Sequence, residues 1–302
     1  ADIASEVRQG KDFSSALSRH PKVFDDIFIN MVRAGEASGQ LDEVLDRLAT
    51  HMEESEELKG EIKSAMTYPV VSLVMIGVIS LGLLVFVLPQ FRDIFEGLNQ
   101  EMPALTAAVM NLSELAQTNF VLILLSIVTM IVGTKVLVGT RRGRRIWDMC
   151  ILKIPVFGPL IRKTIVSRFS GTFATLIKSG VPILGALEIV GQTTGNMLYA
   201  EAIESSAESV RQGESLGQPL ARTRRFPPMV CRMIAIGERS GSLEQLLEKV
   251  AQFYDSEVRS TVKQLTSLIE PFLILIMGAV VGTMVLAMFL PLLSMLGKMG
   301  SH

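Results

Sequence analysis

Runs of apolar residues alternate with polar, helix-patterned stretches along this 302-residue chain. Three runs contain no charged side chain over 19, 20 and 27 consecutive residues, at 70–88, 115–134 and 271–297. A helix needs about 20 such residues to cross the hydrocarbon core of a membrane. We therefore predict three transmembrane helices, at 68–90, 115–139 and 270–297.

The polar stretches show the spacing of amphipathic helices. From Leu243 to Ile269, apolar side chains recur every three or four residues, and the same spacing starts at Leu41. No strand-like alternation competes with this pattern. The helices that it predicts lie near 162–178, 182–193, 196–212, 227–237 and from 242 onward. Because a proline at the membrane edge bends a helix without necessarily ending it, the last helix should continue through Pro271 into the apolar run.

The sequence repeats itself at an offset of about two hundred residues. Val7-Arg8-Gln9-Gly10 returns as Val210-Arg211-Gln212-Gly213, and the offset then settles at 202. The pairs matched at that offset include Phe24 with Phe226, Met31 with Met233, Leu45 with Leu247, Pro69 with Pro271 and Pro89 with Pro291. Two copies of one module, each followed by its own apolar run, favour a pseudo-symmetric scaffold over a single catalytic pocket. Copy one starts inside a helix by this alignment, so we expect it to lack roughly forty residues of the module.

Lysine and arginine flank the apolar runs unevenly. Lys59 and Lys63 precede the first run, and five basic residues occupy 141–153 after the second. The connecting loop at 91–114 holds only Arg92 beside four acidic residues. Basic residues close to a membrane mark its cytoplasmic side. Both polar stretches and the N-terminus are therefore predicted to be cytoplasmic.

These features predict an all-α membrane protein with two homologous cytoplasmic helical-bundle domains, the first N-terminally truncated, and three transmembrane helices. The expected segments are a first cytoplasmic helical domain at 1–67, transmembrane helix 1 at 68–90, a short external loop at 91–114, transmembrane helix 2 at 115–139, a second cytoplasmic helical domain at 140–269, transmembrane helix 3 at 270–297 and an external C-terminus at 298–302. Cys150 and Cys231 then both face the reducing cytoplasm, so no disulfide is expected.

The sharpest local signal is a repeated corner, Gly-Glu-x-Ser-Gly-x-Leu, at 35–41 and again at 237–243. The second glycine of each corner suits the positive φ of a helix stop, and the leucine starts the next apolar stripe. Neither role needs the acidic residue, which could anchor backbone amides at the turn, contact a basic partner or help hold a cation between subunits. The candidate partner-binding residues are Gly35, Glu36, Gly39 and Leu41 with their repeats Gly237, Glu238, Gly241 and Leu243.

The sequence offers no recognisable catalytic, metal or cofactor site. His20, His51 and His302 lack metal-ligand spacing, and two isolated cysteines cannot build a zinc site. No phosphate-binding loop of the form G-x-x-x-x-G-K-[ST] occurs either. We predict that the protein is not an enzyme, uses no cofactor and binds no nucleic acid.

Several stretches of copy two resemble one family of membrane proteins. They are Arg168-Phe169-Ser170-Gly171-Thr172-Phe173-Ala174-Thr175-Leu176, Ser179-Gly180-Val181-Pro182-Ile183, Ala186-Leu187-Glu188 and the corner Ile236-Gly237-Glu238-Arg239-Ser240-Gly241-Ser242-Leu243. With the duplication and the three apolar runs, the chain resembles the type II secretion system F / type IV pilus inner-membrane platform family over essentially its whole length. Copy one departs from the family pattern because it lacks the counterpart of residues 168–188.

That resemblance implies a non-enzymatic, multi-pass platform beneath a growing pilus or pseudopilus, in the bacterial inner (cytoplasmic) membrane. The partners it implies are a cytoplasmic hexameric assembly ATPase, pilins or pseudopilins, other inner-membrane assembly components, further copies of the chain in a homo-oligomer, and the lipid bilayer. Within the third run, Gly278 and Gly282 form a G-x-x-x-G pattern that lets another helix approach closely. That helix could belong to a second copy, to a pilin or to the chain itself.

Two other classes of protein fit parts of the pattern. A membrane transporter built from repeats would place charged or broken-helix sites at mid-membrane. The first and third runs contain no ionisable residue, and Lys135 lies at the edge of the second, which disfavours transport. A membrane dimerisation scaffold unrelated to pili shares the features above, and genetics is needed to separate it from a pilus platform.

Overall fold

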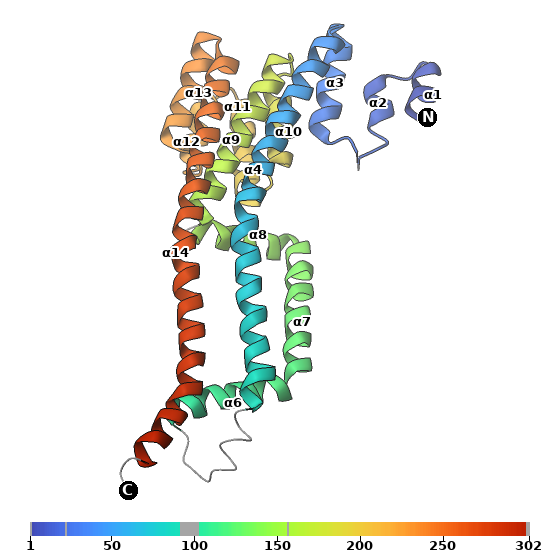
Figure 1. The fold of residues 1–302 in the computed structure, drawn as a ribbon. Helices are drawn as coiled ribbons and strands as arrows, with labels where there is room; N and C mark the ends of the chain where they lie inside the picture. Colours follow the sequence, from blue (N-terminus) through green and yellow to red (C-terminus); the bar gives the residue numbers. More distant parts are fainter. Residues whose placement is uncertain (1, 22, 91–102, 156, 300–302) are drawn as a thin grey trace. The chain divides into compact units, whose positions relative to one another are not determined.

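The computed structural model describes the chain apart from residues 1, 22, 91–102, 156 and 300–302. Within that part every regular element is helical and no strand occurs (Figure 1). The all-α class predicted from the sequence is therefore confirmed. The helices fall into two compact units: unit 1 contains residues 1–62 and 140–262, and unit 2 contains residues 63–139 and 263–302.

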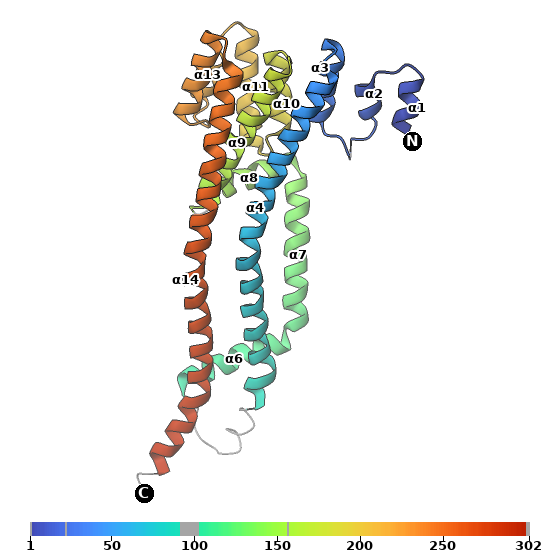
Figure 2. The ribbon, with the colours of Figure 1, turned by 45° about the horizontal axis from the view of Figure 1, so that its top comes forward.

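Unit 1 holds the two polar stretches of the chain. The first stretch contributes α1 (Asp2–Arg8), α2 (Phe13–Leu17), α3 (Asp26–Ser38) and the first part of α4 (Leu41–Gly82). The second contributes α8 (Arg141–Lys153), α9 (Phe157–Lys178), α10 (Ile183–Thr193), α11 (Met197–Arg211), α12 (Gly217–Arg222), α13 (Pro228–Ser240) and the first part of α14 (Leu243–Met299). Figures 1 and 2 show α9, α11 and α13 grouped around the start of α14, and α3 folded back along the start of α4.

The two polar stretches share one hydrophobic core within unit 1, and the predicted division into domains at 1–67 and 140–269 stays a prediction. Leu17 and Met31 of copy one belong to the same buried cluster as Phe169 and Leu247 of copy two, and all four are at most 1% exposed. α1 and α2 are short, with 7 and 5 residues, and much of the apolar surface of α3 and α4 lies against other helices. Those faces pack on α9 and α10 instead.

Local signals in the sequence mark helix ends as predicted. Gly180 has a φ of +82° after the end of α9, and Pro182 lies immediately before α10. At the start of α11, the Asn196 side chain accepts a hydrogen bond from Leu198 N at 3.1 Å. The pattern did not predict α8 or α12. Five basic residues mask the helical spacing of α8, and α12 has only 6 residues.

Unit 2 contains the later parts of α4 and α14, the π-helix η1 (Leu83–Val87), α6 (Ala104–Thr118) and α7 (Phe120–Gly139). Among the described residues, two helices are long and apolar enough to cross a membrane, Leu41–Gln90 and Leu243–Leu290. They contain the first and third predicted spans. The second predicted span corresponds to α7, and its crossing of a membrane stays a prediction.

The segment predicted as a loop at 91–114 is helical from Ala104 onward, which corrects the sequence-based assignment. Residues 91–102 lie outside the described residues. Asn119 then separates α6 from α7, so the helix of the second predicted span begins at Phe120 rather than at residue 115. An asparagine favours helix ends because its side chain competes for backbone hydrogen bonds, here with Leu115 O at 3.2 Å.

The helix α6 is joined to η1 by polar side chains. Ser113 donates a hydrogen bond to Leu84 O, and Gln117 donates one to Val85 O at 3.2 Å. A π-helix changes which backbone amides the carbonyl oxygens of a helix can bond. The two side chains supply donors to carbonyl oxygens of η1.

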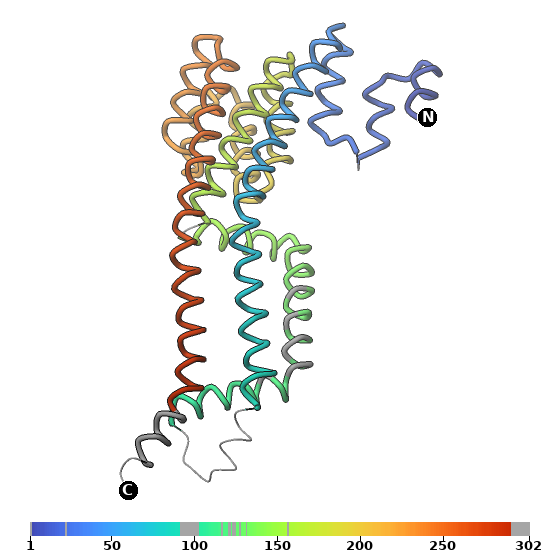
Figure 3. The backbone as a smooth tube through the Cα atoms, viewed as in Figure 1, coloured from blue at the N-terminus to red at the C-terminus, as the bar shows by residue number. Residues whose placement is uncertain are grey.

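Both α4 and α14 are continuous helices with internal prolines (Figure 3). α4 continues through Pro69, and α14 continues through Pro271. The predicted rod from Leu243 through Pro271 is therefore confirmed. The end of α14 at Met299 also means that the predicted C-terminal segment begins inside this helix.

Candidate functional site: the repeated corner

The two predicted corners adopt the same backbone geometry. The glycine that follows each helix has a positive φ, +72° at Gly39 and +70° at Gly241. In both copies the next residue donates its amide to the first glycine of the corner: Gln40 N to Gly35 O and Ser242 N to Gly237 O, each at 3.0 Å. This bond pattern is typical of a glycine helix stop, so the predicted role of both positive-φ glycines is supported by their geometry.

The first glycine of each corner allows two helices to approach closely. A Cβ atom placed on Gly35 would lie 3.2 Å from Leu41 Cα, and one placed on Gly237 would lie 2.8 Å from Leu243 Cα. Carbon atoms in favourable contact are about 3.5 to 4.0 Å apart. The leucine of each corner therefore packs directly on the glycine backbone, which leaves no room for a side chain at Gly237 and little at Gly35.

The acidic side chain of each corner accepts hydrogen bonds from the start of an earlier helix in its own copy. The bonds are Phe13 N to Glu36 Oε1, Ser14 N to Glu36 Oε2 (3.1 Å), Leu216 N to Glu238 Oε2 (2.9 Å) and Ser215 Oγ to Glu238 Oε2 (2.6 Å). Ser14 and Leu216 are equivalent at the 202-residue offset, so one backbone bond is built twice. The amides lie where α2 and α12 begin, and amides at a helix start have no acceptor within their own helix.

The surroundings of Glu36 favour its charged form. Burial by itself raises the pKa of this carboxyl group, but hydrogen bonds from Ser14 and Phe13 and the positive charge of Arg33 outweigh burial. The pKa of Glu36 therefore lies below its usual value. The carboxylate is ionised at neutral pH and accepts both amides as an anion.

Of the three roles considered for the glutamates, the geometry shows the anchoring of backbone amides in both copies. No group of three or more His, Cys, Asp or Glu side chains is arranged to hold a metal ion in the described part of the chain. Contact with a partner stays a prediction for all eight corner residues. The donors to the glutamates were not predicted, although the repeat offset relates Ser14 to Leu216.

Gly278 and Gly282 lie one helical turn apart on α14, in unit 2. A Cβ atom added to either would meet no neighbouring atom within 4 Å. The described residues of the chain therefore leave open space over both glycines. Close approach of a partner helix at this point stays a prediction.

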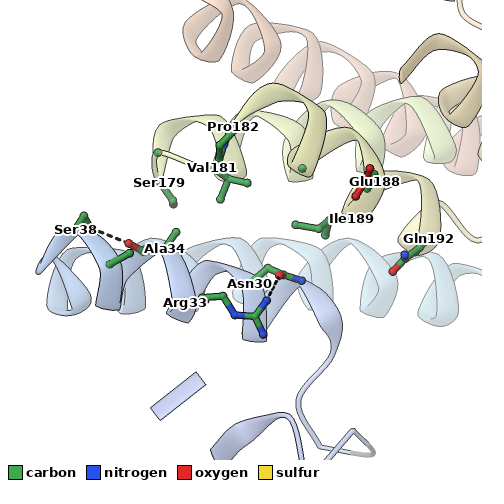
Figure 4. Close-up of a pocket in the computed structure, with 13 residues that line it drawn as sticks. Asn30, Arg33, Ala34, Ser38, Ser179, Val181, Pro182, Glu188, Ile189 and Gln192 are labelled. Carbon is green, nitrogen blue, oxygen red and sulfur yellow. Dashed lines mark hydrogen bonds between the residues drawn. The ribbon is translucent and has the colours of Figure 1, made fainter. Parts of the chain in front are cut away.

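A groove of about 620 Å³ lies between α3 of copy one and α10 of copy two (Figure 4). Its lining side chains include Asn30, Arg33, Ala34 and Ser38 on one wall and Val181, Pro182, Glu188, Ile189 and Gln192 on the other. Arg33 donates a hydrogen bond to Asn30 Oδ1 at 3.1 Å. The groove joins the two copies, so no pattern within a single copy could predict it.

A second cleft, of about 570 Å³, is lined by the first parts of α4 and α14 and by α9. Arg259 of α14 forms ion pairs with Glu57 (3.5 Å) and Glu61 of α4. Half-buried His51 of α4 lies beside Thr172 of α9, with 3.4 Å between Nε2 and Oγ1. Burial lowers the pKa of His51 below its usual value.

Taken with the duplicated corners, two membrane-length helices define the class of this chain as an all-α membrane protein built from a repeated module. Comparison with known proteins then identifies its family. Residues 1–89 and 169–291 match the family described as Type II secretion system (T2SS), protein F. The chain belongs to this family, as its resemblance predicted.

Relatives that cover most of the chain have names from two assembly systems. The "Type IV pilus assembly protein PilC" of Myxococcus xanthus is 43% identical over 296 residues, which are 98% of this chain and 71% of that protein. The protein of the same name from Thermus thermophilus is 44% identical over 298 residues, 98% of this chain and 73% of the relative. The "Type II secretion system protein F" of Pseudomonas aeruginosa is 33% identical over 293 residues, 97% of this chain and 72% of the relative.

Proposed function

We propose that this chain is an inner-membrane platform protein of a filament-assembly machine, either a type IV pilus or a type II secretion pseudopilus. In this proposal a cytoplasmic hexameric ATPase moves the platform, and the platform transfers that movement to pilin or pseudopilin subunits. The proposal rests on the family match in both copies of the module, together with relatives of 43% and 44% identity that are named as pilus assembly proteins.

Two long helices support the transfer of movement. α4 has 42 residues and α14 has 57, so at 1.5 Å per residue they extend about 60 and 85 Å. Each combines a first part packed in the core of unit 1 with a later apolar part. A displacement applied to the first part of such a helix moves its apolar part as well, because the hydrogen-bonded rod is continuous.

We infer a multi-pass topology in which 1–67 and 140–269 are cytoplasmic, while 91–114 and 298–302 are external. Reporter fusions after residue 105 should give an external signal, and fusions after residues 145 and 215 an internal one. The basic residues at 141–153 are the physical reason. An internal signal at residue 105 would remove one span and with it the cytoplasmic placement of both copies.

The corners are our proposed contact for a partner such as the assembly ATPase, because the same turn is kept in both copies. Energy then comes from that partner. We accordingly expect the purified chain to hydrolyse no ATP above a mock preparation. Turnover that persists after contaminating ATPases are removed would contradict the platform role.

The decisive experiment is an in-frame deletion of the gene in its own bacterium, with the intact gene returned on a plasmid as the control. Loss of surface pili with normal protein secretion assigns the chain to a pilus, and the reverse assigns it to a secretion pseudopilus. Electron microscopy counts the pili, and the culture supernatant reports secretion. A deletion strain with normal pili and normal secretion would refute both assignments and favour a membrane scaffold unrelated to pili.

A further inference from the structure

One face of α8 packs against the other helices of unit 1. Asp148 is 8% exposed, and its carboxylate accepts a hydrogen bond from Met197 N at 2.7 Å, where α11 begins. Leu152 is 5% exposed and belongs to the core, and Arg145 pairs with Glu201 of α11 at 3.1 Å. These contacts determine which side of α8 faces away from the unit.

The outward face of α8 is both apolar and basic. Ile146 is 64% exposed, Trp147 46% and Met149 39% in the described structure. With 3.6 residues per turn, Arg142 and Lys153 fall on the same side as Ile146, opposite the buried Asp148, and both are exposed. Asp148 is the one acidic residue in α8, so every charge on the outward face is positive.

Chain connectivity limits where this face can lie. α7 ends at Gly139 and α8 begins at Arg141, which leaves Thr140 alone between them. The Thr140 side chain accepts a hydrogen bond from Gly143 N at 3.1 Å, so α8 starts as a new helix with its own cap. Because consecutive Cα atoms are about 3.8 Å apart, α8 must start beside the end of α7. The proposed topology puts that end at the cytoplasmic edge of a span.

We propose that the outward face of α8 lies in the headgroup layer of the inner leaflet and binds anionic phospholipid. In this arrangement Ile146 points into the boundary between headgroups and acyl chains, Trp147 and Met149 lie at the two edges of the face, and Arg142 and Lys153 contact lipid phosphates. Helices that lie in a membrane interface combine an apolar face with basic residues in this way, and tryptophan favours that depth. This inference rests on the cytoplasmic placement of residue 140 in the proposed function.

The chemistry of the face favours lipid over an acidic protein. A purely electrostatic contact with an acidic partner needs no exposed isoleucine or methionine between the basic residues. The bilayer, in contrast, offers apolar and anionic groups at one depth, next to the end of α7. Each lysine or arginine near an anionic leaflet strengthens binding about fivefold.

The single tryptophan of the chain is Trp147, so fluorescence excited selectively in tryptophan reports this face alone. The full chain is placed in vesicles of phosphatidylcholine with increasing phosphatidylglycerol, in which a fraction of the acyl chains is brominated. We expect bromine to quench Trp147 and the quenching to increase with phosphatidylglycerol. The double variant R142Q/K153Q should bind the anionic lipid about thirtyfold more weakly and need a higher phosphatidylglycerol fraction. The matched control R239Q/K249Q removes the same charge from exposed positions of α13 and α14 and should leave the titration unchanged.

Cys150 provides a second measurement, because it is exposed while Cys231 is buried. A nitroxide on Cys150 should collide more often with oxygen than with a water-soluble nickel complex when the face lies in the membrane. Equal access to the nickel complex in all lipids, with Trp147 unquenched by bromine, would overturn the inference and indicate water or an acidic protein at this face. If the fusion after residue 145 is then still internal, the proposed topology survives; an external signal there would remove the topology itself.

Discussion

Replacing Glu36 and Glu238 by glutamine should affect folding stability unequally, although the two residues are repeat equivalents. Glu36 uses both carboxylate oxygens, one for Phe13 N and one for Ser14 N. Glutamine has a single side-chain oxygen, and its NH₂ group would face one of the two amides as a second donor. Glu238 uses Oε2 alone for both of its donors. One amide oxygen of glutamine can replace it there.

The expected magnitudes follow from that difference. A hydrogen bond to a charged group contributes about 1.5 to 3 kcal/mol and a neutral one about 1 kcal/mol. Both glutamates are half-buried, so values toward the lower limit apply. E36Q should lower the free energy of unfolding by about 2 kcal/mol, and E238Q by about 1 kcal/mol or less. E53Q, at an exposed position of α4, should change it by less than about 0.5 kcal/mol.

Chemical unfolding of the chain in detergent, followed by far-ultraviolet circular dichroism, measures these differences. Because the pKa of Glu36 is lowered in the folded state, its contribution is complete above the ordinary carboxyl pKa and is lost as pH falls through the lowered value. E36Q should therefore make stability less dependent on pH in the acid range. A cost for E238Q equal to or greater than that for E36Q would refute the reasoning from acceptor atoms. A stable E238Q protein that cannot assemble filaments would instead indicate a partner contact.

Three further changes test other parts of the molecule. Gly237→Ala should destabilise the corner by about 2 kcal/mol in the same unfolding assay, because a Cβ would lie 2.8 Å from Leu243 Cα; an unchanged midpoint would contradict this packing. Gly278→Leu or Gly282→Leu should reduce cross-linking between copies in membranes without preventing insertion, and unchanged cross-linking would show that this face is not a contact. His51→Gln should weaken the pH dependence of the melting temperature, because burial lowers the pKa of His51 and disfavours its charged form in the folded state. The fold therefore loses stability as pH falls below the ordinary histidine pKa of about 6.5. A variant that follows the wild-type pH curve would exclude His51 as the cause.

Features that depend on residues adjacent in the sequence could be predicted. Gly180 and Asn196 mark helix ends through their own backbone preferences and side chains, and the helix through Pro271 follows from an unbroken apolar stripe. The shared core of the two copies could not be predicted in this way. An apolar stripe on α3 indicates that this side is buried, but not that α10 of the other copy covers it.

The candidate site shows the same limit. Positive φ at Gly39 and Gly241 could be predicted because glycine adopts it without strain. The hydrogen bonds that Glu36 and Glu238 accept come from donors 22 and 23 positions earlier, beyond the reach of local pattern. The internal repeat could extend that reach, since a contact seen in one copy predicts the equivalent contact in the other.

Divergence between the copies allows a contact that two identical modules could not make. Residue 259 is the equivalent of residue 57 at the 202-residue offset, and Arg259 pairs with Glu57 at 3.5 Å. Where equivalent residues of two copies meet, identical copies bring the same side chain to both sides of the contact. Identical modules would place two glutamates or two arginines there, and like charges repel. Because the duplicated copies differ at this position, the contact becomes an ion pair, which favours pairing of copy one with copy two over pairing of either copy with itself.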